Sequence, residues 1–186
     1  MEAILAATAQ LLEKLGYART TTNAIAERAG VSIGSLYEYF PNKDSVVVAL
    51  MEQQLDEQFA VFSGALEEMT EVPLAQATRA LIEILIASKR VRPKLMQALA
   101  TAGPTEVRAA FMRRFNQRSC QVVLAALRDR PEMARDQDLE LSTFMAVNAV
   151  YGIIDAVLVE RPSLLQSDDL IDELSALILG YLRTTP

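Results

Sequence analysis

Polar side chains that could bind a partner gather between residues 32 and 40. A short helix predicted to begin at Ser32 has only Leu36 and Phe40 on one apolar stripe, at positions i and i+4. This leaves the other positions for solvent or a partner, namely Ile33, Gly34, Ser35, Tyr37, Glu38 and Tyr39. Outward hydroxyl groups beside a glycine that permits close approach suit hydrogen bonding at the edge of a DNA major groove, which admits a helix of this size.

The next predicted helix carries a lysine at its start, where the helix macrodipole repels cations. Asn42 is expected to cap this helix and Asp44 suits its positive end, whereas Lys43 does not. A phosphate group would remove the conflict, because free N–H groups, the dipole and a lysine together form an anion site.

A second short helix and a tight turn must position these groups. Thr22 is expected to cap the first helix, and Ile25 and Ala26 fall on its inner face. Gly30 lies where this helix must stop, because glycine adopts the left-handed conformation without a Cβ clash. Ser32 then caps the following helix, so the pattern predicts two helices joined by a turn.

Many fixed spacings occur together between Ile4 and about Leu50. They are Ile4-Leu5-Ala6-Ala7, Leu12-x-x-x-Gly16-Tyr17, Thr21-Thr22-x-x-Ile25-Ala26-x-x-Ala29-Gly30-Val31-Ser32 and Gly34-Ser35-Leu36-Tyr37-x-Tyr39-Phe40-x-Asn42-Lys43-Asp44. This run resembles the helix-turn-helix of the tetracycline-repressor (TetR) family of bacterial transcription regulators. The resemblance implies that Thr22, Tyr37, Tyr39 and Lys43 contact DNA phosphates, and that Asn23, Ile33, Gly34 and Ser35 lie close to bases. With Ser32, these residues form the predicted DNA-binding set.

The fold class follows from length, helical periodicity and the resemblance together. The 186 residues, of which 51% are hydrophobic, suffice for one small and one medium domain, and no segment alternates as a strand. We therefore expect an all-α protein with about nine helices. A three-helix, homeodomain-like helix-turn-helix DNA-binding domain is expected at residues 1–45, and a helical effector-binding and dimerisation domain at 46–186.

Composition argues against catalysis and against a metal or cofactor site. The chain has no histidine and a single cysteine, Cys120, which is expected to be a small buried residue. Common metal sites and nucleophile–base pairs need clustered cysteine, histidine or a substitute base, and no phosphate-binding loop is present. We therefore expect neither an enzyme nor a cofactor.

The charge balance weakens a simple nucleic-acid interpretation. The net charge is −6, and residues 1–45 contain four basic and five acidic side chains, a net charge of −1. Many members of the resembling family carry a basic arm before the first helix, whereas this sequence begins almost within that helix. Either such an arm was trimmed or affinity depends on a few well-placed donors, in which case the salt dependence of binding is shallow.

Localisation is expected to be cytoplasmic. The longest uncharged run, from Leu141 to Ile154, is shorter than a membrane-spanning helix, and the N-terminal residues lack the pattern of a signal peptide.

Two C-terminal helices, predicted at 139–159 and 167–182, have the character of a dimer interface. The first is apolar on both sides, which is unusual for a surface helix. Paired with a symmetry mate, the two could form a four-helix bundle, whereas the alternative is burial within one subunit. The expected interface residues are Ala146, Ala149, Gly152, Ile153, Ala156, Leu170, Leu174, Leu177, Ile178 and Tyr181.

The resemblance also implies a small-molecule cavity in the helical body. Candidate lining residues are Phe59, Phe62, Leu85, Met96, Phe111, Met112, Phe115, Asn116, Phe144, Asn148 and Tyr151, although each could instead simply fill the core. With few charges among them, we expect an apolar or aromatic effector. The predicted function is a homodimeric repressor released by this effector from a palindromic operator, which it grips through two recognition helices roughly 34–36 Å apart. The alternative is an all-helical carrier or sensor of apolar molecules that does not bind DNA.

Overall fold

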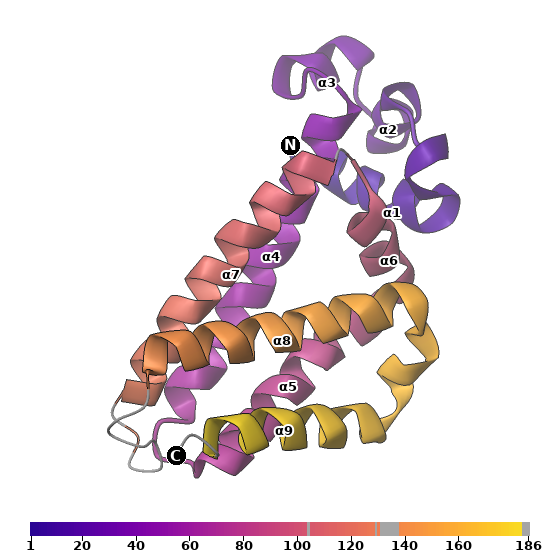
Figure 1. Cartoon of the computed structure of the whole chain (residues 1–186). Coiled ribbons are helices and arrows are strands. Elements are labelled where there is room, and N and C mark those ends of the chain that lie inside the picture. The colour runs from indigo at the N-terminus through magenta and orange to yellow at the C-terminus, as the bar shows by residue number, and fades with distance from the viewer. Residues whose placement is uncertain (104, 129, 131–137, 184–186) are drawn as a thin grey trace. The chain divides into compact units, whose positions relative to one another are not determined.

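The computed structural model describes residues 1–103, 105–128, 130 and 138–183. Within these ranges every regular element is a helix, which confirms the all-α prediction (Figure 1). The elements are α1 (Glu2–Arg19), α2 (Thr22–Ala29), α3 (Ile33–Tyr39), α4 (Lys43–Glu68), α5 (Leu74–Val91), α6 (Pro93–Thr101), α7 (Thr105–Arg128), α8 (Leu139–Glu160), the 3₁₀ helix η1 (Pro162–Gln166) and α9 (Asp168–Arg183).

The first compact unit consists of Met1–Glu57 and Arg92–Phe111. Within it, α1 packs against both α2 and α6, and α2 packs against α3. Its core is built from large side chains that are almost fully buried, namely Ile4, Leu12, Ile25, Leu36, Val46, Val47 and Leu95. This core holds α1, α2 and α3 in place.

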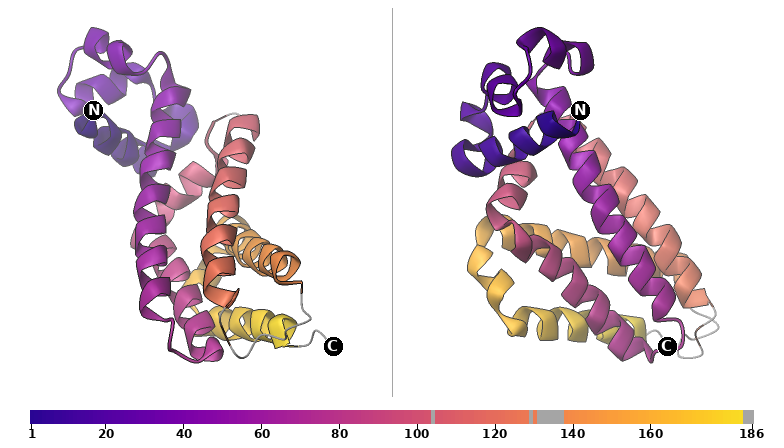
Figure 2. Two further views of the ribbon diagram at one scale, coloured as in Figure 1. Left: turned by 90° about the vertical axis from the view of Figure 1, so that its left-hand side faces the viewer. Right: turned by 180° about the vertical axis from the view of Figure 1, so that it is seen from behind.

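The second compact unit consists of Gln58–Val91 and Met112–Pro186. Here α5 packs against α9 and η1, while η1 connects α8 to α9 (Figure 2). Ile86, Ile154, Leu158 and Leu165 are its most deeply buried large side chains. The described part of this unit is thus a helical body with its own core.

These compact units do not coincide with the predicted ranges 1–45 and 46–186. Helix α6 belongs with the N-terminal helices, because Leu95 and Leu99 are buried beside α1. The guanidinium of Arg92 also donates two hydrogen bonds of 2.8 Å to the carboxylate of Glu13. Contacts between residues so far apart in the chain cannot be predicted from local sequence patterns.

Helix α8 is long and apolar enough to cross a membrane by length and composition alone, with a mean hydropathy of 1.6 over an 18-residue window. Half of that window is buried inside the fold, as in the core helix of a soluble protein, so this is weak evidence for a membrane span. The predicted range of this helix, 139–159, agrees with α8 (Leu139–Glu160) to within one residue. The apolar window is longer than the uncharged run of 14 residues because it admits up to two charged residues.

Candidate functional site

The turn between α2 and α3 is fixed by caps at both sides. Thr21 Oγ1 accepts a hydrogen bond of 3.2 Å from the Ala24 backbone N–H, so the expectation that Thr22 caps α2 was wrong by one residue. Gly30 ends α2 with φ 69° and ψ 30°, as predicted for a left-handed cap. Ser32 Oγ accepts from the Ser35 N–H at 3.0 Å, which confirms Ser32 as the cap of α3.

Helix α3 buries one stripe and exposes the rest. Leu36 is 0% exposed and Phe40 is also buried, which confirms the predicted apolar stripe. Tyr37 and Tyr39 are 49% and 60% exposed, and Ile33 is also exposed. A Cβ added at Gly34 would meet nothing closer than Ser32 Oγ at 3.6 Å, an ordinary contact, so the fold itself does not require glycine there.

Hydroxyl groups connect α2 to α3 on the outer side of this turn. The hydroxyls of Thr22 and Tyr37 are hydrogen bonded at 3.1 Å, and those of Ser32 and Ser35 at 2.9 Å. Asn23 is exposed on α2. Each hydroxyl can donate one bond and accept others, so these pairs still offer groups to a ligand.

The start of α4 is capped as predicted, because Asn42 Oδ1 accepts a hydrogen bond of 2.8 Å from the Ser45 N–H. Further contacts, which the sequence did not predict, join this start to the end of α1. Lys43 Nζ donates to the Tyr17 carbonyl oxygen at 3.0 Å and lies 3.9 Å from the centroid of the Tyr17 ring. The Tyr17 hydroxyl is hydrogen bonded to the Asp44 carboxylate, and burial with this bond raises the pKa of Tyr17 to about 12. Lys43 thus has an internal partner that offsets its position at a helix start.

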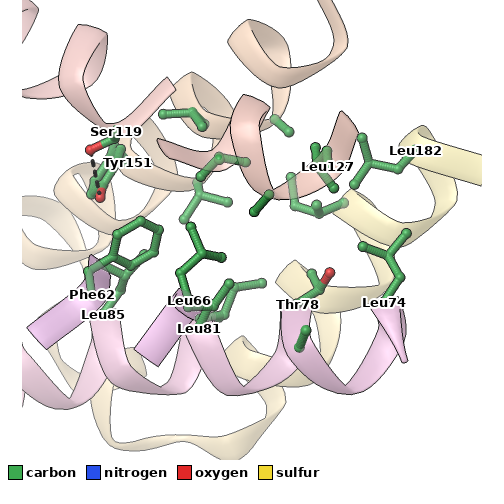
Figure 3. A pocket seen from close by; sticks show the side chains of 18 of the residues that line it. Phe62, Leu66, Leu74, Thr78, Leu81, Leu85, Ser119, Leu127, Tyr151 and Leu182 are labelled. Carbon is green, nitrogen blue, oxygen red and sulfur yellow. Dashed lines mark hydrogen bonds between the residues drawn. The ribbon is translucent and has the colours of Figure 1, made fainter. Parts of the chain in front are cut away.

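The second unit contains a partly open cavity of about 90 Å³ (Figure 3). Its wall is mostly hydrocarbon, and only Thr78, Ser119, Arg130 and Tyr151 bring polar side-chain groups to it. The remaining lining residues are Phe62, Leu66, Leu74, Ala77, Leu81, Ile82, Leu85, Val123, Ala126, Leu127, Ala146, Val147, Val150, Ile178 and Leu182. Five helices, from α4 to α9 without α6, contribute to this wall.

Three of the predicted lining residues, Phe62, Leu85 and Tyr151, line this cavity, and the others do not. Near it, the Phe115 and Tyr151 rings meet edge to face with centroids 4.9 Å apart. Asn116 Nδ2 donates to Asn148 Oδ1 at 2.9 Å, so these two amides satisfy each other in part.

The remaining candidates lie elsewhere. Phe59 is covered by the Arg118 guanidinium at 3.7 Å, Met112 is half-buried on α7, and Met96 and Phe111 belong to the first unit. Phe144 is 55% exposed, because the buried stripe of α8 passes through Thr143 and Val147 instead.

A polar layer lies one helical turn beyond Phe62, Leu85 and Tyr151. Lys89 Nζ donates to Gln58 Oε1 at 3.3 Å, whereas the buried Gln58 Nε2 has no hydrogen-bond partner among the described residues. Burial lowers the pKa of Lys89 and raises the pKa of Asp155, and each charge partly offsets the effect on the other. Burial also raises the pKa of Tyr151 to about 12. The Tyr151 hydroxyl, like that of Tyr17, therefore stays protonated at neutral pH.

Arg130 was not identified from the sequence. Its side chain is 9% exposed and reaches the carbonyl oxygens of Val72 at 2.6 Å and Met69 at 2.7 Å, in the turn between α4 and α5. The sequence feature that could have indicated Arg130 as a buried residue is its position three residues after Leu127, at the end of an apolar helical stripe.

An apolar surface remains uncovered on α8 and α9 of this protomer. We call it the α8/α9 surface; it consists of Leu141, Phe144, Met145, Val159, Leu177 and Tyr181, all exposed. Of the predicted interface residues, Gly152, Ala156, Leu177 and Tyr181 are exposed, Ala149, Ile153 and Leu170 are half-buried, and Ala146, Leu174 and Ile178 are buried within the protomer. Ala146 and Ile178 line the cavity instead.

A helix-turn-helix whose second helix is exposed, joined in one chain to a helical body with an apolar cavity, is the arrangement expected of a ligand-responsive DNA-binding regulator. Residues 4–50 match the family described as bacterial regulatory proteins, tetR family, and residues 73–182 match the tetracyclin repressor-like C-terminal domain. The chain belongs to the tetR family.

The matches to curated relatives cover only part of the chain. The chain is 43% identical over 68 residues to the uncharacterized HTH-type transcriptional regulator YvkB of Bacillus subtilis, covering 37% of this chain and 33% of that protein. It is 33% identical over 96 residues to the HTH-type transcriptional regulator EthR of Mycolicibacterium smegmatis, covering 52% and 44%. The chain therefore spans less than half the length of either relative.

Solved structures extend the likeness of fold to nearly the whole chain. The fatty acid degradation regulator FadR from Bacillus halodurans superposes with a TM-score of 0.77 at 20% identity, covering 98% of this chain and 95% of that one. FadR from Bacillus subtilis, solved in complex with stearoyl-CoA, gives a TM-score of 0.70 at 18% identity, with 100% and 99% covered.

Proposed function

We propose that this protein is a cytoplasmic, homodimeric DNA-binding transcriptional regulator, a repressor that a small, largely apolar effector releases from a palindromic operator. The observation that carries the proposal is the exposed side of α3. Leu36 and Phe40 anchor this helix, whereas Ile33, Tyr37 and Tyr39 are exposed and Ser35 is half-buried, so this side can meet a groove. An isolated carrier of apolar molecules would have no use for such a helix.

Base and phosphate contacts divide among the residues around α3. We expect Asn23, Ile33 and Ser35 to lie close to base edges, with Gly34 allowing close approach, and Ser32 to belong to the same DNA-binding set. Thr22, Tyr37 and Tyr39 offer hydroxyl groups to phosphates, which position a protein without reading sequence. Lys43 keeps further N–H donors after its bond to the Tyr17 carbonyl, so it can add a phosphate contact.

The α8/α9 surface supports the dimer. Six exposed apolar side chains on two helices favour an interface, and a twofold contact would bury them against their symmetry mates. A dimer then places two copies of α3 on one face of the operator. Only few basic side chains accompany them, so we expect operator affinity to fall gently with salt.

The cavity supports the effector. Its hydrocarbon wall favours an apolar ligand, and a ligand shifts the equilibrium toward the dimer state that it prefers. We propose that this preferred state no longer fits the operator.

Mobility-shift measurements with DNA from upstream of the protein's own gene test the proposal. Tyr37→Ala and Lys43→Ala should weaken binding by about tenfold or more, since each removes a phosphate contact. Lys14→Ala removes an exposed cation of α1 and serves as the matched control, with little effect expected. Circular dichroism and gel filtration must show that all variants remain folded and dimeric. Unchanged affinity of both variants would refute the roles of Tyr37 and Lys43, and absence of DNA binding by the native protein would favour the carrier.

A further inference from the structure

Arg130 is the one charged side chain among the described residues that line the cavity. It lies at the end marked by Leu74 and Leu127: its backbone N–H donates to the Leu127 carbonyl oxygen at 3.2 Å, and its guanidinium reaches Met69 and Val72, just before α5. A side chain 9% exposed has lost most of its hydration. Burial of a guanidinium is costly unless other groups compensate its charge.

The contacts of Arg130 within the described residues supply hydrogen bonds but no opposite charge. Both acceptors are neutral carbonyl oxygens, and no ion pair joins Arg130 to a carboxylate in the ranges 1–103, 105–128 and 138–183. The guanidinium has further N–H donors beyond the two that these carbonyls accept. An anionic group at this end of the cavity would provide both the acceptors and the charge.

The rest of the cavity is shaped for hydrocarbon. On α5 the lining runs from Leu74 to Leu85, a span of about 16 Å at a rise of about 1.5 Å per residue. Figure 3 shows Leu74, Leu127 and Leu182 at one end, with Phe62, Leu85 and the hydrogen-bonded Ser119 and Tyr151 hydroxyls at the other. Arg130 thus lies at one end of the lining and the Ser119 and Tyr151 hydroxyls at the other, with a long apolar wall between them.

We propose that the effector is an elongated apolar carboxylate, whose acid group pairs with Arg130 and whose hydrocarbon chain follows α5 toward Tyr151. This inference rests on the proposed function, because it names the ligand class of the same cavity. A carboxylate accepts charge-assisted hydrogen bonds from a guanidinium, and these gain strength away from water. An alcohol of equal length can accept a hydrogen bond from the guanidinium but brings no negative charge, and an amine brings a second cation to Arg130.

Isothermal titration of the full chain with straight-chain acids, from hexanoate to dodecanoate, and with the matching alcohols and amines tests the proposal. The native protein should bind the best acid about tenfold or more tightly than the alcohol of equal length, and the amine most weakly. Arg130→Gln should abolish this preference while the alcohol still binds, and Arg130→Lys should keep part of it. Arg128→Gln removes an exposed guanidinium two residues away and should change nothing.

Several outcomes would overturn the proposal. Alcohols that bind the native protein as tightly as acids would do so, as would an acid preference that survives in Arg130→Gln. Since Arg130 also holds the Met69 and Val72 carbonyls, the glutamine variant can fail to fold; the comparison of acid with alcohol on the native protein then decides alone.

Operator binding, measured in parallel, separates this inference from the proposed function. Acid binding without any DNA binding would refute the regulator and leave the carboxylate site standing. DNA binding with no response to any of the amphiphiles would refute the carboxylate site and leave the DNA-reading role of α3 intact.

Discussion

Helix α3 and the cavity differ in the direction in which their polar groups point. At α3, hydroxyl groups face outward from a helix anchored by Leu36 and Phe40, whereas in the second unit hydrocarbon faces inward and the one lining cation, within the described chain, is buried. The first arrangement suits a large polar surface such as DNA, and the second a small amphipathic molecule. Changes at the two places should therefore have separable effects on DNA binding and on ligand binding.

The largest effect is expected on the α8/α9 surface. Leu177→Glu places a carboxylate on a side chain that is 54% exposed in the protomer, so folding should be unaffected. If α9 pairs with its symmetry mate, each buried carboxylate costs several kcal/mol, and the dimer should dissociate. Gel filtration with light scattering measures this. Val61→Glu, at an exposed apolar position on α4, is the matched control and should stay dimeric.

The second effect concerns the anchor of α3. Leu36→Ala should destabilise the first unit by about 2–5 kcal/mol, because Leu36 is fully buried. Hydrogen exchange should rise mainly in α1 to α3, and operator binding should fall with it. The counterpart Leu85→Ala should raise exchange in α5 and reduce ligand binding. If either variant reduced protection from hydrogen exchange equally in both units, the expectation that the two units respond separately would be wrong.

The third effect is a change in DNA affinity without a loss of stability. Gly34→Ala introduces a methyl group that meets only Ser32 Oγ at 3.6 Å, and alanine in a helix gains about 0.5–1 kcal/mol over glycine. If α3 enters the groove closely, the same methyl group should cost about 1–3 kcal/mol of operator binding. Gly64→Ala, where a Cβ meets nothing within 4 Å, should give the stability gain alone. Thermal melts and mobility shifts together check the pair.

The smallest effect is expected at the ion pair between Glu13 and Arg92. The hydrogen bond from Arg92 holds the pKa of Glu13 below its ordinary value. The pair therefore stabilises the fold fully at pH values above the ordinary pKa of a glutamate. The stabilisation is lost as pH falls through the lowered pKa. Since both side chains are partly exposed, Arg92→Gln should cost no more than about 1 kcal/mol at pH 7 and almost nothing near pH 3. Urea denaturation of both proteins across this range measures the difference, and a difference that grows in acid would contradict it.

Local rules explain how much of α3 and its turn the sequence could predict. The positions of Gly30, Ser32 and Asn42 follow from backbone geometry within a few residues, and the outward direction of Tyr37 follows from helical periodicity. Even the error at Thr21 was one of a single residue. The contact of Lys43 with Tyr17 escaped prediction because it depends on how α1 meets α4.

The cavity escaped prediction for a related reason. Periodicity finds that α8 is apolar on two sides but cannot decide which side faces the interior, so Phe144 was expected inside and lies outside. Five helices must be packed before a void between them exists. The position of Arg130 at the cavity could not be recognised before the helices are packed, whereas Leu85 and Tyr151 could be proposed as lining residues because the family resemblance implied a cavity in the helical body.

The contacts among Tyr17, Lys43 and Asp44 act as a latch between the last turn of α1 and the first turn of α4. Helices α2 and α3 lie in the chain between these two connected ends. We therefore expect α1, α2 and α3 to move together, so that a change in operator binding would involve all three helices and not the orientation of α3 alone.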